Sequence, residues 1–460
     1  MLNKKITSLL KEIEQTQFLE ILLTLPSREQ GLICRQLCNF DFELLERMKK
    51  TLDKGSRSFE KVTPYTTKRK RGDGELKQIG AELLKKGKCG ILVVAGGLGS
   101  RLRYQGPKGC FPISPVRQKS LYQRLAERCV AASSQVGHPL QIAFMTSASN
   151  HAETGAYFAQ NAFFGLAPGQ LSIMVQPTWP VLDLKGNLFL ESPGKIATGP
   201  NGNGSALASL VEEGVLNRWK QLGIEYIVFI QIDNPLADPF DPEFLGFAAT
   251  AGGEVVVKAI ERMDPDENVG ILVKKETDKL GVCEYNEMES ALRTKRDGHG
   301  GLLFPLANIS HFCFTVSFVE RSLSFELPLH PAKKSLKQLM SDRTSLLPEK
   351  PNGWKFEHFI FDVLPFARRG EAMIYPREEC FAPLKNYQGD DSVATVQKQL
   401  VEIDRRMYAS ISGLPIESSR GPFELSMDFH YPTQELLDDW KGKPLPEVDY
   451  ICATSRRNAR

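Results

Sequence analysis

Long apolar runs are missing from this sequence of 460 residues, and so is any Cys-x-x-Cys pair. No apolar stretch approaches the ~20 residues that a membrane-spanning helix needs. At the N-terminus, Lys4 and Lys5 precede only a short apolar stretch that Lys11 interrupts, which does not fit a secretory signal peptide. We therefore expect a protein that works in the cytoplasm and has no membrane partner.

The nine cysteines are scattered along the chain. Cys34 and Cys38 lie four residues apart on a predicted helix, but no second close pair completes a zinc-binding set. This usage predicts reduced thiols with structural roles, as in a cytoplasmic protein.

A strong charge of one sign is also lacking. The 58 basic and 55 acidic side chains give a net charge of +3, too small to indicate nucleic acid as a partner. One local basic run, Lys68 to Arg71, is followed by glycines, Asp73 and Glu75, which favours a solvated linker over a polyanion-binding patch. The hydrophobic fraction of 42% and the charged fraction of 25% are ordinary for a globular protein with a large core.

The length predicts two or three domains. Residues 1–87 show apolar residues at helical spacing, with Ser27 and Gln30 as a capping box, and then the basic linker. From residue 88 onward, apolar β-branched runs alternate with helical segments such as Ser120–Ala132 and Ser205–Leu222. The runs are Cys89–Ala95, Ile142–Met145, Leu171–Val175, Tyr226–Ile232 and Glu254–Ile260.

This alternation predicts an α/β fold, with a mostly parallel, Rossmann-like mixed sheet in a central domain of residues 88–386. A small C-terminal domain of residues 387–460 follows. Ligands of such sheets bind beyond the carboxyl ends of the strands, so the segments that follow the strands are the candidate site.

The first predicted strand leads into a glycine-rich loop, Ala95-Gly96-Gly97-Leu98-Gly99-Ser100-Arg101-Leu102, and then Pro107-Lys108-Gly109. Glycines let the backbone approach a ligand, and free amide groups in such a loop can bind phosphate oxygens. Neither the P-loop motif nor the dinucleotide fingerprint is present, because Gly-Lys-Ser/Thr and the third glycine are absent. A hydride-transfer enzyme is therefore disfavoured.

The loop resembles the signature of the sugar nucleotidyltransferases. Together with Ser120 to Gln123 and Ala126 to Arg128 it is similar to the UDP-N-acetylhexosamine pyrophosphorylases, the eukaryotic-type branch of the UDP-sugar pyrophosphorylase family. Further blocks follow in the family's order between residues 88 and 390: Phe144–Ser147, Phe163–Leu166, Gly202–Gly204, Asp233-Asn234, Val282–Tyr285, Asn308-Ile309, Lys355–Asp362 and Pro383–Asn386. Two positions depart from the family, since Arg103 and Ser205 stand where it has glycine.

The resemblance implies a nucleotidyltransferase that joins UTP and a sugar 1-phosphate, with N-acetylglucosamine 1-phosphate as the first choice, into a UDP-sugar and pyrophosphate. The attacking phosphate is already an anion, so the chemistry needs positioning and charge stabilisation rather than a general base. Arg101, Lys108 and Lys385 are the candidate catalytic cations. Asp233, at the end of a predicted strand, is the candidate ligand of Mg²⁺, with Mn²⁺ as a substitute.

The remaining candidates bind the two substrates. The nucleotide-binding set is Ala95, Gly96, Gly97, Gly99, Gln176 and Gly202, and the sugar-binding set is Asn203, Glu284, Asn308, Phe359 and Phe361. Phe359 and Phe361 share one face if their segment is extended, and a core role for these rings is equally open. His151, His311 and His358 are expected to be structural.

Two alternatives stay open. One is the same reaction on glucose 1-phosphate or on a broad range of sugars, and the other is an inactive nucleotide-sugar sensor. We expect a monomer or a weak homo-oligomer.

Overall fold

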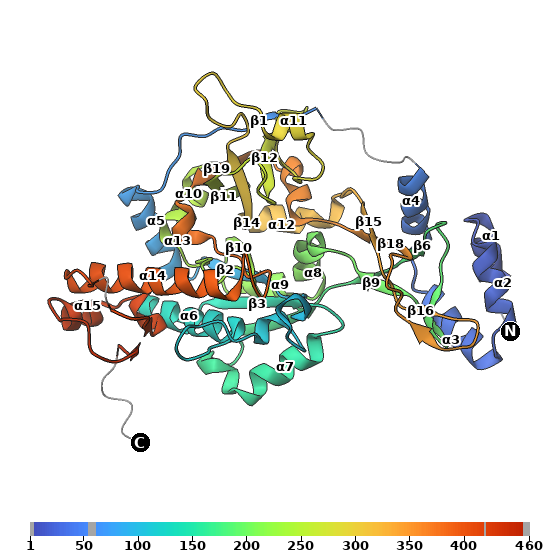
Figure 1. The fold of residues 1–460 in the computed structure, drawn as a ribbon, viewed down its shortest axis with the longest axis horizontal. Helices are drawn as coiled ribbons and strands as arrows, with labels where there is room; N and C mark the ends of the chain where they lie inside the picture. Colours follow the sequence, from blue (N-terminus) through green and yellow to red (C-terminus); the bar gives the residue numbers. More distant parts are fainter. Residues whose placement is uncertain (1–3, 54–60, 418–419, 454–460) are drawn as a thin grey trace. The chain divides into compact units, whose positions relative to one another are not determined.

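The computed structural model describes residues 4–53, 61–417 and 420–453 (Figure 1). The chain forms two compact units, each assembled from three segments: residues 1–60, 176–205 and 326–362 in unit 1, and residues 61–175, 206–325 and 363–460 in unit 2. The domain boundaries after residues 87 and 386 stay a prediction. Over the described residues, every helix is too short or too polar to cross a lipid bilayer.

The centre of unit 2 is a mixed sheet. Its strands β10, β2, β3 and β4 lie side by side and are all parallel. Their bounds are Tyr226–Gln231, Cys89–Val94, Gln141–Thr146 and Leu171–Val175. Each is a strand that the apolar runs predict, so the parallel half of the expected sheet is confirmed.

The other half of the sheet is mainly antiparallel. Strand β14 (Leu306–Thr315) pairs antiparallel with β10, with β11 (Val255–Glu261) and with β12 (Gly270–Lys274). β11 pairs parallel with β19 (Gly370–Ile374), and β12 pairs antiparallel with β13 (Leu280–Cys283) and β1 (Thr63–Pro64). The sheet is therefore mixed, and the expectation of a mostly parallel sheet fails for this half because β14 runs against its neighbours.

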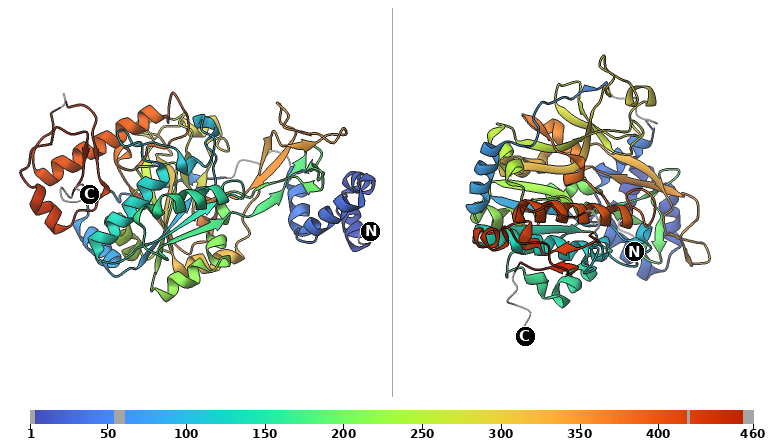
Figure 2. Two further views of the ribbon diagram at one scale, coloured as in Figure 1. Left: turned by 90° about the horizontal axis from the view of Figure 1, so that it is seen from below. Right: turned by 60° about the vertical axis from the view of Figure 1, so that its left-hand side comes forward.

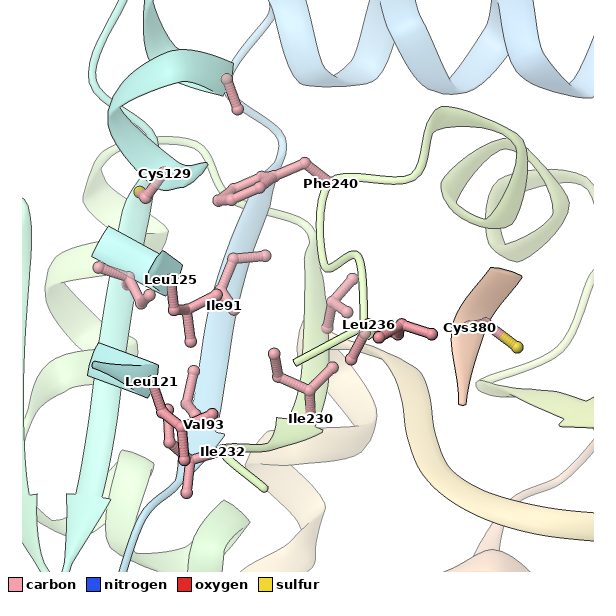
Figure 3. Close-up of a cluster of buried hydrophobic side chains, with 14 of the residues drawn as sticks. Ile91, Val93, Leu121, Leu125, Cys129, Ile230, Ile232, Leu236, Phe240 and Cys380 are labelled. Atoms are coloured by element: carbon pink, nitrogen blue, oxygen red, sulfur yellow. The ribbon is translucent and has the colours of Figure 1, made fainter. Parts of the chain in front are cut away.

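Helix α6 (Leu121–Val136) covers the parallel strands on one face. Figure 3 shows its residues Leu121 and Leu125 against Ile91 of β2 and Ile230 of β10, within one buried apolar cluster. Ser120 caps the helix by accepting a hydrogen bond from the backbone of Gln123, as its position in the sequence predicts.

Helices α5 (Gly74–Lys85) and α10 (Pro242–Thr250) cross in unusually close contact, because a Cβ at Gly80 would lie 1.7 Å from the carbonyl oxygen of Pro242. The predicted helix over residues 205–222 is instead two helices, α8 (Ala206–Glu212) and α9 (Val215–Gln221), since Gly214 adopts φ 71° between them. The remaining helices of the central part are α7 (His151–Gln160), α11 (Ser290–Arg293), α12 (Val316–Arg321) and α13 (Arg377–Cys380).

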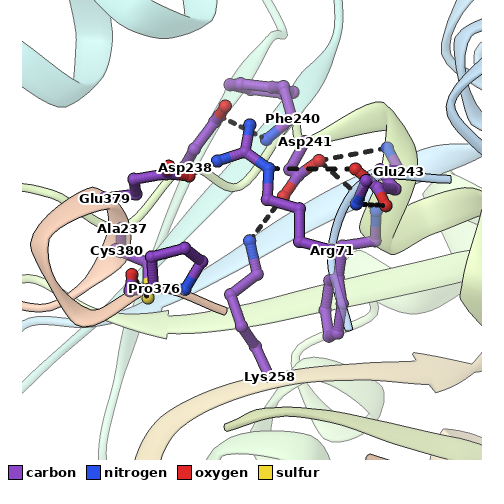
Figure 4. A network of polar contacts seen from close by, with 12 residues as sticks. Arg71, Ala237, Asp238, Phe240, Asp241, Glu243, Lys258, Pro376, Glu379 and Cys380 are labelled. Atoms are coloured by element: carbon purple, nitrogen blue, oxygen red, sulfur yellow. Dashed lines mark hydrogen bonds and ion pairs between the residues drawn. The ribbon is translucent and has the colours of Figure 1, made fainter. Parts of the chain in front are cut away.

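The four residues of the basic run, Lys68 to Arg71, are exposed to solvent and lie beside strand β19. Arg69 and Arg71 exchange backbone hydrogen bonds with Ile374 of β19. The side chain of Arg71 forms an ion pair with Glu379 and lies 3.8 Å from Glu243. Figure 4 shows Arg71 within this network of charges, and its side chain is 43% exposed. The exposure of the run agrees with the expected solvated segment, and its acidic partners come from elements that the local sequence does not show.

The C-terminal elements of unit 2 share a small apolar cluster of their own, which includes Tyr408, Phe429 and Ile451. The elements are α14 (Val393–Ser412), β20 (Glu424–Leu425), α15 (Gln434–Trp440) and β21 (Tyr450–Ile451). In the left view of Figure 2 they gather at the far end of the long helix α14.

Unit 1 contains the predicted N-terminal helices, α1 (Lys4–Glu12), α2 (Thr16–Thr24), α3 (Ser27–Leu37) and α4 (Phe42–Asp53). The predicted capping box is wrong, because Pro26 is the N-cap of α3 and no side chain caps it. These helices pack on short strands through a cluster that includes Leu22, Leu45, Leu188 and Phe356. The strands are β5 (Thr178–Pro180), β6 (Leu182–Asp183), β7 (Leu190–Ser192), β8 (Lys195–Ile196), β9 (Thr198–Pro200), β15 (His330–Lys334), β16 (Gln338–Leu339), β17 (Ser345–Leu346) and β18 (Gly353–Glu357).

Candidate active site

The glycine-rich segment after β2 is a closed loop. The backbone N–H of Lys108 donates to the carbonyl of Gly97 at 3.0 Å, and that of Gly99 donates to the carbonyl of Gly106 at 3.0 Å. A Cβ at Gly99 would lie 2.9 Å from two carbons of Tyr104, so no larger residue fits there. The loop thus presents backbone to its surroundings, which suits the binding of phosphate oxygens.

Asn150 holds this loop from inside the protein, a role that the sequence reading missed. Its Nδ2 donates to the carbonyls of Ala95 (3.0 Å) and Gly97 (3.3 Å), while its Oδ1 accepts from the N–H of Ser147 (2.8 Å). Gly96 lies between the two bonded carbonyls. An asparagine in front of a helix normally reads as an N-cap, but this side chain makes no cap bond to α7.

Lys108 and Asp233 meet beyond the carboxyl ends of β2 and β10. Because these two strands are adjacent and parallel, the segments that follow them lie at the same edge of the sheet. The Nζ of Lys108 lies 3.3 Å from Oδ2 of Asp233, and the side chains are 11% and 22% exposed. The structure therefore brings the predicted catalytic lysine and the predicted metal ligand into direct contact.

Lys385 is carried by a segment that is bonded to the same strand end. The N–H of Leu384 donates to the carbonyl of Asp233 at 2.7 Å. The Nζ of Lys385 lies 3.4 Å from Oδ2 of Asp391, and both side chains are about one third exposed. This lysine thus faces partly to solvent and is held by a surface-type ion pair that a phosphate could replace.

The two arginines of the loop, Arg101 and Arg103, differ in their contacts and in their backbone conformation. Arg101 lies in the 3-10 turn Ser100–Leu102 and is exposed, and across the described residues its guanidinium has no hydrogen bond or ion pair. Arg103 adopts the left-handed backbone conformation (φ 56°, ψ 31°), and its guanidinium lies 4.9 Å from the ring of Tyr387. The family's glycine at this position would adopt that backbone without strain, so arginine accommodates the same turn at some energetic cost.

Glu284 and Asn308, two of the predicted sugar contacts, lie close together around Gly270 at the start of β12. A Cβ at Gly270 would lie 3.3 Å from Oε1 of Glu284 and 3.7 Å from Cβ of Asn308. Asn308 is buried, and its Oδ1 accepts from the N–H of Ser310, a residue with φ 54° at the irregular centre of β14. Among the described residues, the Nδ2 of Asn308 has no hydrogen-bond acceptor, so this donor group is available for a further partner.

Gln176, Gly202 and Asn203 belong to unit 1. Gln176 is buried and its Nε2 donates to the carbonyl of Gly202. Gly202 has φ 89° and packs on the backbone of His358, since a Cβ there would lie 2.2 Å from its carbonyl oxygen. Asn203 accepts a hydrogen bond from the N–H of Ile360 at 2.9 Å. These contacts explain why glycine and short polar residues occur here, and the predicted roles in ligand binding stay predictions.

Phe359 and Phe361 do not lie on an extended strand. Residues Ile360–Phe366 form a 3-10 turn, so the assumption of a shared strand face is wrong. The two rings still pack together, with centroids 5.1 Å apart, because the tight turn brings them to one side. Phe361 is buried and Phe359 is half-buried, which leaves Phe359 the more accessible of the two.

Two titratable groups next to the candidate residues are held neutral. Burial, assisted by the charge of Glu153, raises the pKa of Cys110 to about 12, so this thiol beside the loop is not a nucleophile at neutral pH. Burial and the charge of Arg47 lower the pKa of His358 to about 4. Neither group is therefore suited to acid-base chemistry at neutral pH.

A mixed α/β sheet with a glycine loop, a cation and a carboxylate at the ends of adjacent strands is the arrangement that we expect of a nucleotidyltransferase. Comparison with known proteins gives the particular family: the family model described as UTP–glucose-1-phosphate uridylyltransferase matches residues 40–413. The chain belongs to this family of uridylyltransferases, as its resemblance to the UDP-sugar pyrophosphorylases implies.

Several relatives have a more specific name. The chain is 31% identical over 382 residues to the probable UDP-N-acetylglucosamine pyrophosphorylase of Dictyostelium discoideum, covering 78% of both chains. It is 33% identical to the UDP-N-acetylglucosamine pyrophosphorylase of Saccharomyces cerevisiae, covering 69% of this chain and 68% of the relative. Its fold is similar to the crystal structure of the uridine diphosphate N-acetylglucosamine pyrophosphorylase of Trypanosoma brucei, with a TM-score of 0.78, 26% identity, and 97% and 96% of the two chains covered.

Proposed function

We propose that this enzyme forms a UDP-sugar and pyrophosphate from UTP and a sugar 1-phosphate, with N-acetylglucosamine 1-phosphate as the sugar substrate. The names of the relatives support the substrate. The contact between Lys108 and Asp233 carries the proposal, because it pairs a cation with a carboxylate beside a glycine loop whose backbone suits phosphate binding.

The reaction is a direct substitution at phosphorus. An oxygen of the sugar 1-phosphate forms a bond to the α-phosphorus of UTP, while the bond from that phosphorus to the bridging oxygen breaks. The bridging oxygen leaves with the electron pair as part of pyrophosphate. The nucleophile is already an anion, so the protein contributes alignment and positive charge.

The chain's cations divide these tasks. Arg101 and Lys108 bind the triphosphate and stabilise charge on the departing pyrophosphate, Arg101 as a fork of donors and Lys108 as a point charge. Lys385 binds the sugar phosphate or the α-phosphate. The nucleotide contacts are Ala95, Gly96, Gly97, Gly99, Gln176 and Gly202, and the sugar contacts are Asn203, Glu284, Asn308, Phe359 and Phe361.

Asp233 fits a ligand of Mg²⁺ by its chemistry. It offers hard carboxylate oxygens, and its side chain is 22% exposed beside the loop. In the part of the chain that the structure describes, no cluster of three acidic, histidine or cysteine side chains could hold a metal. Phosphate and water oxygens would therefore complete the coordination, and the ion would neutralise phosphate charge.

A panel of sugar 1-phosphates tests the substrate. Purified enzyme with UTP and Mg²⁺ should release pyrophosphate fastest with N-acetylglucosamine 1-phosphate. A clear preference for glucose 1-phosphate, the substrate in the family's description, would reject this choice. Absence of turnover with every sugar would indicate a sensor.

Two variants test the site. Lys108→Ala should lower turnover at least ~100-fold, the scale of losing a preorganised charge. Asp233→Ala should abolish magnesium-dependent turnover, and an unchanged dependence on the metal would remove Asp233 from the metal site.

A further inference from the structure

Three hydrogen bonds join the end of β10 to the segment that carries Lys385. The carbonyl of Asp233 accepts from the N–H of Leu384 at 2.7 Å. The side chain of the next residue, Asn234, donates from Nδ2 to the carbonyl of Cys380 at 2.7 Å and accepts at Oδ1 from the N–H of Ala382 at 3.1 Å. Asn234 is 6% exposed, so water does not compete with these bonds.

These bonds connect the two segments that carry Asp233 and Lys385, two residues with roles in the proposed reaction. Asp233 directly precedes Asn234, and Lys385 directly follows Leu384. We propose that Asn234 is a positioning residue, which fixes the distance between the carboxylate of Asp233 and the ammonium of Lys385. This inference rests on the proposed function, because it assigns a use to those two groups.

The side-chain chemistry explains why an asparagine is needed. An amide offers one donor and one acceptor side by side, which match the carbonyl of Cys380 and the N–H of Ala382. Aspartate at residue 234 keeps the acceptor for the N–H of Ala382 but places a second oxygen, in place of the donor, opposite the carbonyl oxygen of Cys380. The segment would then shift to separate these two oxygens, because a buried acceptor without a donor is costly.

The segment has other attachments that would keep it folded after such a shift. On the N-terminal side of Cys380, Arg377 forms an ion pair with Glu267. Glu379 forms an ion pair with Arg71 in the network of Figure 4. On the C-terminal side of Ala382, the N–H of Lys385 donates to the carbonyl of Asp391 at 2.8 Å. Loss of the amide should thus displace Lys385 without unfolding the protein.

The first experiment measures kcat and KM of Asn234→Asp with UTP, N-acetylglucosamine 1-phosphate and Mg²⁺. We expect kcat to fall 10- to 100-fold, the scale of a small misplacement of reacting groups, with a change in the KM for UTP below threefold. An unchanged kcat, or a loss confined to KM, would overturn the proposal.

Asn352 supplies a matched control. This half-buried side chain makes a similar pair of bonds, from Nδ2 to the carbonyl of Leu336 (3.0 Å) and from the N–H of Leu336 to Oδ1 (2.7 Å), within unit 1. Its Nδ2 also donates to Oε1 of Gln338 at 3.1 Å. Asn352→Asp should keep kcat within twofold of the wild type. An equal loss of kcat in both variants would show a general effect of replacing a bonded amide by a charge and would overturn the proposal.

A double-mutant cycle separates positioning from stability. In a Lys385→Ala background, Asn234→Asp should lower kcat less than twofold, because the group that it positions is gone. A loss equal to that in the wild-type background would refute the role. Full activity of Lys385→Ala alone would instead refute the proposed function of that lysine. If Asn234→Asp does not fold, Asn234→Ser, which is smaller and adds no charge, enters the same cycle with the same criteria.

Discussion

Removing the ammonium of Lys108 should strengthen the binding of a divalent ion to the ligand-free protein. In the structure the Nζ of Lys108 lies 3.3 Å from the carboxylate of Asp233, so the lysine already neutralises the proposed metal ligand. The change Lys108→Met keeps most of the side-chain volume and removes only the charge. A metal ion would then meet an unpaired carboxylate.

The distance sets the size of the effect. Two unit charges 3.3 Å apart interact by about 5 kcal/mol at an effective dielectric constant of ~20 and by about 1.3 kcal/mol in water. Both side chains are partly exposed, and solvent-exposed pairs are weak, so about 1–2 kcal/mol is the realistic range. This corresponds to roughly 5- to 30-fold tighter binding of the ion.

Titration of ligand-free protein with Mn²⁺, followed by electron paramagnetic resonance, measures this affinity. Arg101→Met is the matched control, because it removes a cation of the same loop, and in the described chain that cation forms no ion pair with Asp233. Equal affinities of wild type, Lys108→Met and Arg101→Met would refute the reasoning. Tighter binding that persists after Asp233→Asn would show that the ion binds elsewhere.

Three further predictions concern the fold around the site. Gly109→Ala places a Cβ 2.2 Å from two ring carbons of Tyr122, so calorimetry should show a loss of about 1–3 kcal/mol, and unchanged stability would contradict the packing. Lys258→Met breaks a buried 2.6 Å pair with Asp241 and should cost about 3–5 kcal/mol in urea unfolding, and a cost below 1 kcal/mol would show that the pair is dispensable. Because the pKa of His358 is lowered to about 4, the unfolded chain binds more protons below pH 6.5, so stability falls from pH 6.5 toward 4. His358→Gln should flatten that part of the stability profile, and an identical profile would exclude His358 as its cause.

The local sequence was sufficient to predict the positions of the parallel strands and of the glycine-rich loop between residues 95 and 108. Apolar runs such as Cys89–Val94 are buried on both faces, so their composition reflects their environment directly. The same reading did not show the ion pairs of the exposed basic run, because the acidic partners of Arg71 are distant in the sequence. It failed for β14, whose direction depends on which strands it pairs with.

The sequence by itself determined the chemistry that is available: a glycine loop that presents backbone, two cations beside it and a carboxylate at a strand end. Which groups meet was decided by the tertiary structure, because Lys108, Asp233 and Lys385 are separated by more than a hundred residues at each step. Parallel pairing of β2 with β10 brings the first two together, and the amide of Asn234 ties the segment of the third to them. Hydrogen bonds between distant segments leave no pattern in a single sequence, so contacts of this kind could be identified only in the folded structure.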